Sequence, residues 1–420
     1  MREGPVGAGD GLATGVGGQP LVARQPVFDP ANRVMGYELL YRGAPPAAGE
    51  HADWSEQATS SVLLDLIAGG GLDGLLGEQT AFVNLPRSFL LDFRQGGLDP
   101  SRLVLEVLED VDPDPEVKRA MRALKDDGYT LALDDFVLFG QHQGLLELAD
   151  LVKVDIQGYD DQGLRECVRE LRRYPLYLVA EKVETHAEQA LCRELGFDYF
   201  QGYFFAQPRA VARAPMPSDR LTALRLLGRL QDPAVDLEDL TDLISQDVYL
   251  SYRFLRLINS AFFPLRRRID SIHRALVYLG LDTVRIWATW LAMAGIGGKP
   301  RELAVTNLVR ARMAASLGRA LGDPEPERYF TAGLFSTLDA LLDRPLREAL
   351  EELPLSEELM TALLYGEGPV GETLAAVRAY ERADWQGTAH LGLALEQVGE
   401  AYLEAVQWAE EARAAMDAGS

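Results

Sequence analysis

The sequence contains few of the residues that most often bind transition metals or form disulfides. Among 420 residues there are two cysteines, Cys167 and Cys192, which form no Cys-x-x-Cys pair, and five histidines. Both cysteines lie in helix-like stretches, so we expect ordinary reduced thiols in the core. A disulfide framework and a cysteine-rich zinc site are both excluded.

Long apolar runs and an excess of basic residues are also missing. The most apolar stretch, residues 286–298, is shorter than the roughly 20 residues that a membrane-spanning helix needs. A formal net charge of -23 repels phosphate backbones and anionic lipid surfaces. We therefore expect no membrane span and no bulk nucleic acid as a partner. Binding of a small anionic ligand is not excluded, because a metal ion can neutralise the charge of its site.

The first twenty residues are rich in glycine and lack a basic start followed by an apolar run. This composition predicts a disordered tail over residues 1–20 and no signal peptide, and hence a cytoplasmic protein.

The rest of the chain is long enough for two domains. From residue 21 to residue 208, short β-rich runs alternate with helix-like segments, the pattern of parallel strands joined by crossover helices. Eight strands are the number that closes an α/β barrel of the TIM type. The runs are 21–28, 34–41, 80–84, 102–106, 130–135, 151–155, 176–181 and 197–201.

After a proline-containing linker at residues 209–218, the pattern changes. Apolar residues recur at three- and four-residue spacing, which predicts an all-α domain over residues 219–415. The clearest helical segments are 221–230, 237–246, 249–259, 272–279, 303–321 and 391–416.

Polar and charged residues end almost every strand run of the first domain. They are Asn84, Glu106, Asp134, Asp135, Lys153, Asp155, Glu181 and Gln201, and Glu38 joins them if its strand presents it inward. A single acid at a strand end is usually a solvated loop residue or a helix cap. Because the ends of parallel strands meet on one face of a barrel, this whole set predicts one shared pocket.

Several carboxylates that share one pocket would raise one another's pKa values unless a cation lay among them. Oxygen ligands of this kind suit Mg²⁺ or Mn²⁺, and paired metals are a common means of hydrolysing a phosphodiester. The adjacent pair Asp134-Asp135 would bridge two such ions. Lys153 could orient the attacking water or contact a phosphate oxygen.

These residues resemble the motifs of the EAL family of cyclic di-GMP phosphodiesterases over residues 20–208. The matching segments are Glu38-Leu39-Leu40-Tyr41-Arg42, Val83-Asn84-Leu85, Glu106-Val107-Leu108-Glu109, Asp134-Asp135-Phe136, Lys153-Val154-Asp155, Ala180-Glu181-Lys182-Val183-Glu184-Thr185 and Gln201-Gly202-Tyr203. The family reaction is metal-assisted opening of the cyclic dinucleotide to the linear one.

The resemblance implies a role for each matched residue. It assigns Glu38, Asn84, Glu106, Asp134, Asp135 and Gln201 to metal binding. Lys153 and Glu181 would position or activate the water, with Glu184 as a third catalytic residue of this group. Gln25, Arg42 and Asp155 would contact the nucleotide, and Glu109 would anchor the neighbouring loop.

Three departures from the family pattern predict little or no turnover. Val137-Leu138-Phe139-Gly140 stands where the family has a Gly-Thr-Gly-Tyr-Ser-Ser loop, so bulky apolar residues replace small flexible ones. Lys182 replaces a glycine, and Leu108 replaces a threonine. The metal-binding residues are kept while the residues around them change. Such changes can lower metal affinity or activity 10–100-fold.

The second half resembles the HDOD family through Leu257-Ile258-Asn259-Ser260-Ala261, Ile269-Asp270-Ser271-Ile272 and Ala275-Leu276-Val277-Tyr278-Leu279-Gly280. The related hydrolases bind metal through a His-Asp pair, and Ser336 and Thr337 stand at that position here. We therefore expect no cofactor in this domain and a role in binding a protein partner. His273 is interpreted as a capping or packing residue and Trp287 and Trp290 as core. The basic run 266–268 is a solvated loop or a docking surface.

Three functions stay open at this point. The barrel could bind cyclic di-GMP or metal with little turnover, it could be an active Mg²⁺- or Mn²⁺-dependent phosphodiesterase, or the whole chain could be a scaffold without nucleotide binding. The sequence names neither the protein partner nor the oligomeric state, and a homo-oligomer stays open.

Overall fold

The structure is a computed structural model that describes residues 21–42, 71–93, 98–138, 140–209, 218–263, 265 and 267–417. The expected tail at residues 1–20, the linker segment 210–217, Phe139 and Arg266 lie outside the described residues. The backbone of Arg42 is described, but its side chain is not, so its expected contact with the nucleotide stays a prediction.

The first half of the chain is a closed barrel of eight strands, in the order β1 to β8. All eight expected strands are present, within a few residues of the expected bounds. They are β1 (Leu21–Phe28), β2 (Val34–Arg42), β3 (Thr80–Leu85), β4 (Leu103–Val107), β5 (Thr130–Leu133), β6 (Leu151–Asp155), β7 (Tyr177–Glu181) and β8 (Tyr199–Gln201).

One strand of the barrel departs from the expected all-parallel arrangement. β1 pairs antiparallel with both β2 and β8, whereas the remaining neighbours pair in parallel. The reason is the short connection after Phe28, since a parallel pair needs a crossover of a dozen or more residues. Asp29 fixes this turn, because its carboxylate accepts hydrogen bonds from the backbone N–H groups of Ala31 and Arg33.

Helices cover the outside of the barrel between the strands. They are α2 (Gly71–Leu76), α3 (Arg87–Asp92), α4 (Pro115–Asp126), α5 (Asp161–Leu171) and α6 (His186–Leu195), with short 3-10 helices at Pro100–Arg102, Gln141–Leu145, Ile156–Gly158 and Tyr203–Ala206. Two of them begin at side chains that cap the first turn. Asp114 caps α4 before a proline, and Thr185 forms a capping box with Glu188 at α6.

Beyond residue 218, the described part of the chain is entirely helical. Its helices are α7 (Ser218–Gln231), α8 (Leu237–Ser245), α9 (Val248–Ile258), α10 (Ile272–Leu279), α11 (Leu281–Ala294), α12 (Arg301–Ala320), α13 (Pro326–Phe335), α14 (Leu338–Leu342), α15 (Leu346–Glu351), α16 (Glu357–Tyr365), α17 (Gly368–Glu381) and α18 (Leu395–Asp417), with a 3-10 helix at Gln386–Leu391. Trp287 and Trp290 are buried in its core, as expected, whereas His273 is exposed.

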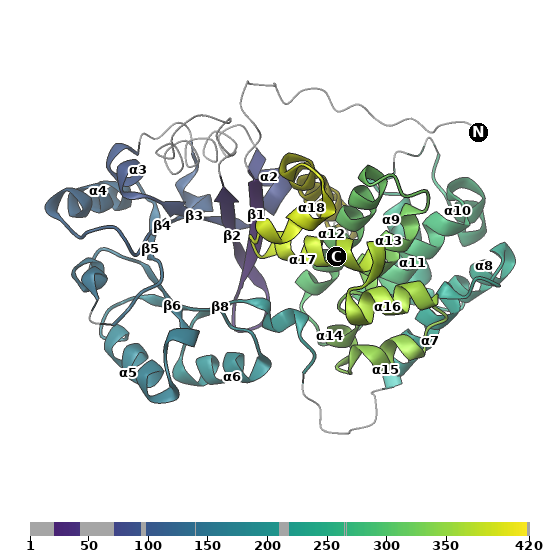
Figure 1. The fold of residues 1–420 in the computed structure, drawn as a ribbon, viewed down its shortest axis with the longest axis horizontal. Coiled ribbons are helices and arrows are strands. Elements are labelled where there is room, and N and C mark those ends of the chain that lie inside the picture. Colours follow the sequence, from purple (N-terminus) through teal and green to yellow (C-terminus); the bar gives the residue numbers. More distant parts are fainter. Residues whose placement is uncertain are drawn as a thin grey trace.

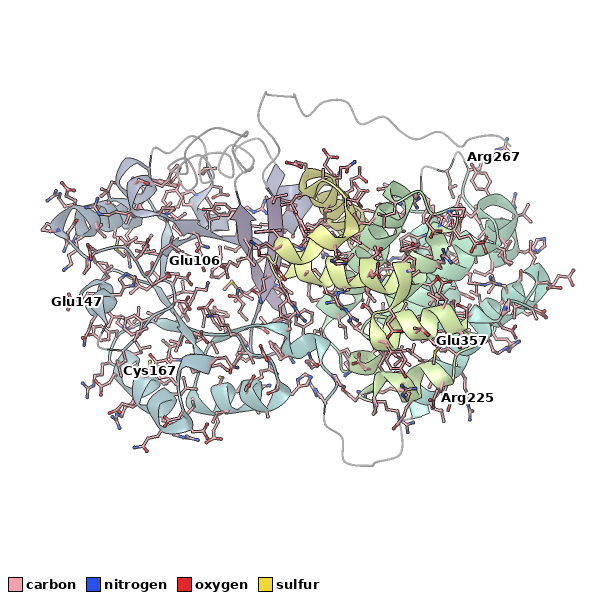
Figure 2. All side chains as sticks on the ribbon, in the orientation of Figure 1. Glu106, Glu147, Cys167, Arg225, Arg267 and Glu357 are labelled. Carbon is pink, nitrogen blue, oxygen red and sulfur yellow. The ribbon has the colours of Figure 1, made fainter. Side chains whose placement is uncertain are left out.

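The two halves pack side by side, with the C-terminal helices between them (Figure 1). α17 and α18 contact β1, and α18 also contacts α2. Glu106 lies inside the barrel half, whereas Glu147 and Arg267 lie at opposite outer ends of the molecule (Figure 2). None of the described helices is long and apolar enough to span a membrane. Cys167 and Cys192 are buried free thiols.

Candidate functional site

Four carboxylates surround one lysine inside the barrel. The Lys153 ammonium is fully buried and lies 3.1 Å from Glu38, 2.9 Å from Glu106, 2.8 Å from Asp134 and 2.9 Å from Glu181. We call these five residues the inner cluster. They come from β2, β4, β6, β7 and the residue that follows β5, so five separate segments of the barrel meet at one point.

The strand pattern explains why these side chains converge. Successive side chains of a strand point to opposite faces, so one residue of each pair enters the barrel and the next packs outward. In β2, Glu38 reaches Lys153 while its neighbour Tyr37 contacts α12 of the helical half. The parallel register places Asn84 opposite Glu106 and Asp155 opposite Glu181. The strand ends therefore share one face, as the sequence predicts.

Two glutamines extend the inner cluster toward β1. Gln201 donates to the carboxylate of Glu38 and, over 3.0 Å, to the side-chain oxygen of Gln25. Gly202, directly after Gln201, has a φ of 143°, and a side chain there would meet the backbone of Val183. Glycine is therefore required to turn the chain beside this glutamine.

The inner cluster has more negative than positive charge. Burial raises the pKa of Glu106 well above its usual value, although Lys153 lowers it. Burial also raises the pKa of Glu181 to about 8, with Lys153 again opposing the change. For Lys153, burial alone would lower the pKa, but the surrounding carboxylates outweigh it and the pKa is raised. One ammonium cannot balance four carboxylates, so the cluster favours an additional proton or cation.

Several buried oxygens at the site have no hydrogen-bond partner. They are Asn84 Oδ1, Glu106 Oε2, Glu181 Oε2 and Gln201 Oε1. Leaving a buried acceptor unpaired is costly, and carboxylate and amide oxygens are the ligands that Mg²⁺ and Mn²⁺ prefer. The donors therefore fit a divalent cation. Within the described ranges, no three His, Cys, Asp or Glu side chains form a ready-made metal site, because the carboxylates close around Lys153 instead.

A second group of carboxylates lies outside the inner cluster. Asp135 and Asp155 both pair with Lys182, which hydrogen-bonds Asp155 and lies 3.6 Å from Asp135. The adjacent residues Asp134 and Asp135 therefore face two different lysines, and Asp135 does not reach the inner cluster. Glu184 is exposed just before α6 and is not among the residues that contact Lys153, so its catalytic role stays a prediction.

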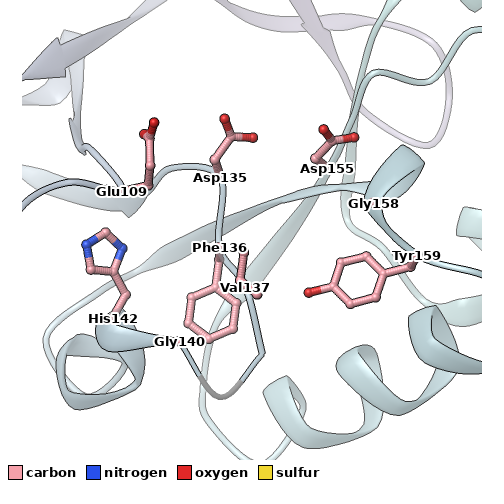
Figure 3. Close-up of a pocket in the computed structure, with 9 residues that line it drawn as sticks. All are labelled: Glu109, Asp135, Phe136, Val137, Gly140, His142, Asp155, Gly158 and Tyr159. Carbon is pink, nitrogen blue, oxygen red and sulfur yellow. The ribbon is translucent and has the colours of Figure 1, made fainter.

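A cavity of about 530 Å³ lies beside this second group. Figure 3 shows Glu109, Asp135 and Asp155 in a row along its rim, with Phe136, Tyr159 and His142 beneath them. The loop after Asp135 forms part of the wall. Phe136 is buried, Val137 is 63% exposed, and the backbone N–H of Leu138 donates to the Tyr159 hydroxyl.

The residues at the expected metal position of the helical half are buried and hydrogen-bonded. Ser336 accepts a hydrogen bond from Arg310 over 3.2 Å, and Thr337 donates to Asn307. Arg310 also forms a bidentate ion pair with Glu381, with N–O distances of 2.8–2.9 Å. An arginine therefore occupies the place beside Ser336, which disfavours a metal ion there.

A polar network that was not predicted from the sequence lies between the two halves. Arg24 of β1 pairs with Glu410 of α18, and the Tyr37 hydroxyl donates to Glu302 of α12 over 2.8 Å. Tyr203, just after β8, donates to the backbone carbonyl of Glu381. One signal was present in the sequence: Arg24 is the charged residue of a mostly apolar strand run, which indicates a specific buried partner.

Comparison with protein families identifies both halves. The model of the EAL domain matches residues 76–208, and that of the HDOD domain matches residues 216–351. The EAL match begins after β2, so the first two strands of the barrel lie outside the matched range.

Two relatives match almost the whole chain. "Cyclic di-GMP phosphodiesterase CdgJ" of Vibrio cholerae is 33% identical over 403 residues, which are 93% of this chain and 92% of that protein. "Uncharacterized protein YuxH" of Bacillus subtilis is 32% identical and covers 92% and 97% of the two chains. Among solved structures, BlrP1 of Klebsiella pneumoniae with calcium and cyclic di-GMP is 26% identical over 46% of this chain and 56% of that one, with a TM-score of 0.38.

Proposed function

Since this chain belongs to the family of two-domain proteins that join an EAL domain to an HDOD domain, we propose that its barrel binds cyclic di-GMP and hydrolyses it slowly. The observation that carries this proposal is the inner cluster with its unpaired buried oxygens, next to a cavity at the strand ends.

Oxygen donors of the inner cluster, together with two amide neighbours, would hold a divalent cation. They are Glu38, Glu106 and Asp134 of the cluster, with Asn84 and Gln201 beside it. A bound Mg²⁺ or Mn²⁺ would polarise the phosphodiester and supply an activated water. Lys153 contacts all four carboxylates and, with Glu181 at 2.9 Å, would orient that water. Gln25, which accepts a hydrogen bond from Gln201, would contact the nucleotide.

Two features around this cluster support slow turnover. Bulky apolar residues follow Asp135 where the family has a small flexible loop, and Leu138 among them donates its backbone N–H to the Tyr159 hydroxyl. Lys182 pairs with Asp135 and Asp155 at the edge of the site. Supporting residues of a metal site can change activity 10–100-fold even when every ligand is present.

An active phosphodiesterase is the second candidate. It is favoured by the relative from Vibrio cholerae, which is named a cyclic di-GMP phosphodiesterase and covers 93% of this chain. The carboxylates that match the family motifs fit both candidates equally well. The rate of hydrolysis therefore distinguishes the two.

The helical half is proposed to bind a protein partner and no metal. The supporting observation is the Arg310–Glu381 pair, which places a guanidinium against Ser336. The exposed Arg267 and Arg268 lie in a loop far from the barrel and belong to the surface that such a partner could contact (Figure 2).

The test combines binding and turnover on the full chain. Calorimetry with cyclic di-GMP in Mg²⁺, Mn²⁺ or chelator, together with release of the linear dinucleotide, is expected to show metal-dependent binding and slow hydrolysis. E106Q should lose binding, whereas E147Q, an exposed control at the outer end of the barrel half, should not. Turnover at the rate of the Vibrio cholerae relative would support the second candidate. No binding in any metal would contradict both and favour a scaffold.

A further inference from the structure

Lys182 is held in an unusual backbone conformation beside the site. Its φ is 55°, in the left-handed region that residues with a side chain rarely adopt. Its carbonyl accepts a hydrogen bond from Gln157, and the next residue, Val183, pairs with the carbonyl of Gln201. The fold therefore tolerates a strained lysine where glycine would be unstrained, which indicates that its side chain has a specific role.

The side chain of Lys182 is directed at the two carboxylates of the outer group. Its ammonium hydrogen-bonds Asp155 and lies 3.6 Å from Asp135. Asp155 is held in place by a second contact, because its other oxygen caps the following 3-10 helix at Gln157. The two contacts hold the Lys182 ammonium on the outer carboxylates.

The inner and outer groups differ in what they offer a metal ion. The inner cluster has buried oxygens without a hydrogen-bond partner, such as Glu106 Oε2 and Glu181 Oε2. The outer pair is partly exposed, with the carboxylates of Asp135 and Asp155 41% and 28% exposed. It shares one ammonium between two carboxylates, whereas the inner cluster shares one among four. A divalent ion at the outer pair would have to displace the ammonium or lie close to a like charge.

We propose that Lys182 is the resident cation of the outer carboxylate pair and excludes a divalent ion from Asp135 and Asp155, so that each chain takes one divalent ion, at the inner cluster. This inference rests on the proposed function for the inner cluster. It revises the expectation that Asp134 and Asp135 bridge two ions, and it gives one reason for slow hydrolysis, because a single ion cannot stabilise both the attacking and the leaving oxygen.

Metal stoichiometry tests the proposal without relying on activity. Equilibrium dialysis against low micromolar Mn²⁺, followed by metal analysis and electron paramagnetic resonance, is expected to give one ion per wild-type chain. K182G and K182M remove the ammonium and should bind two, whereas K182R keeps the charge and should bind one. K182G suits the left-handed backbone, so it should fold at least as well as the wild type.

The matched control is K125M, which removes a partly exposed ion pair with Asp150 away from the site. It should bind one ion. Two ions on the wild-type chain, or one on both K182G and K182M, would overturn the proposal. No ion on the wild type but one on K182G would support the role of Lys182 and contradict the inner site of the proposed function. No ion on any variant would overturn both.

Discussion

Arg24 of β1 and Glu410 of α18 are 386 residues apart in the sequence and form a buried ion pair at 2.8 Å. The Arg24 guanidinium also lies over the ring of Tyr37, 4.2 Å from its centre, and donates to the backbone carbonyl of Leu75. Its neighbour Gln25 faces the inner cluster. A single strand thus contacts the helical half with one residue and the candidate site with the next.

Removing one member of this ion pair should strongly destabilise the protein. Among the residues that the structure describes, R24M leaves buried Glu410 with Arg413 as its remaining cationic partner. Breaking a buried pair typically costs about 3–5 kcal/mol. Chemical denaturation of the full chain measures the change. The matched control is R33M, which breaks the exposed pair with Asp29 and should cost less than about 1 kcal/mol. Equal effects of the two substitutions would contradict the importance of burial.

The interface should make stability depend on pH through Glu302. Burial raises its pKa to about 7, with Glu410 adding to the rise and Arg24 opposing it. Between its ordinary pKa of 4.5 and about 7, the folded chain keeps a proton that the unfolded chain has lost. This contribution to stability is therefore full below pH 4.5 and declines as the pH rises to 7, by on the order of 3 kcal/mol.

The variant E302Q isolates this effect, because its amide keeps a polar partner for the Tyr37 hydroxyl but cannot titrate. Unfolding free energies between pH 5 and pH 8 should fall less steeply for E302Q than for the wild type. Parallel pH profiles for the two proteins would show that Glu302 does not contribute.

Removing the central ammonium of the site should destabilise the barrel. K153M leaves four carboxylates without their shared cation, which should cost about 3–5 kcal/mol and abolish turnover. Added Mn²⁺ should raise the unfolding midpoint of K153M more than that of the wild type, since a divalent ion can replace part of the lost charge. A midpoint unaffected by the substitution would contradict the inner cluster as described.

Replacing the apolar loop should raise the rate of hydrolysis. Changing Val137, Leu138 and Phe139 to Gly, Thr and Gly restores the small residues of the family loop, and we expect a rise of about 10–100-fold. Release of the linear dinucleotide measures the rate. The same affinity for cyclic di-GMP in both proteins would show that the loop acts on turnover. An unchanged rate would mean that the loop does not limit hydrolysis.

The hydroxyls at the expected metal position of the helical half should matter for packing alone. S336A and T337A together remove the hydrogen bonds with Arg310 and Asn307, at a cost of about 1–3 kcal/mol. Turnover and cyclic di-GMP binding should not change. Metal analysis completes the test, since the double variant should bind as many Mn²⁺ ions as the wild type, and a lower number would indicate a metal in the helical half.

Much of the candidate site was predictable from local sequence. Alternation within a strand sends Glu38 and Lys153 to the inside of the barrel, and the shared direction of parallel strands brings Glu106, Asp134 and Glu181 to the same end. The eight strands and the helical second half follow from hydrophobic periodicity, because burial of one face requires that pattern in the chain itself.

The sequence by itself thus determined which residues form the elements and which side chains enter the barrel. Only the tertiary structure decided that Asp134 and Asp135 face different lysines and that Arg24 meets Glu410. The lysine partners of the two aspartates depend on how the strand ends meet around the barrel, and the Arg24–Glu410 pair joins the two halves of the molecule. Contacts between segments hundreds of residues apart leave no periodic signal in the sequence, because they are fixed only when the two halves pack together.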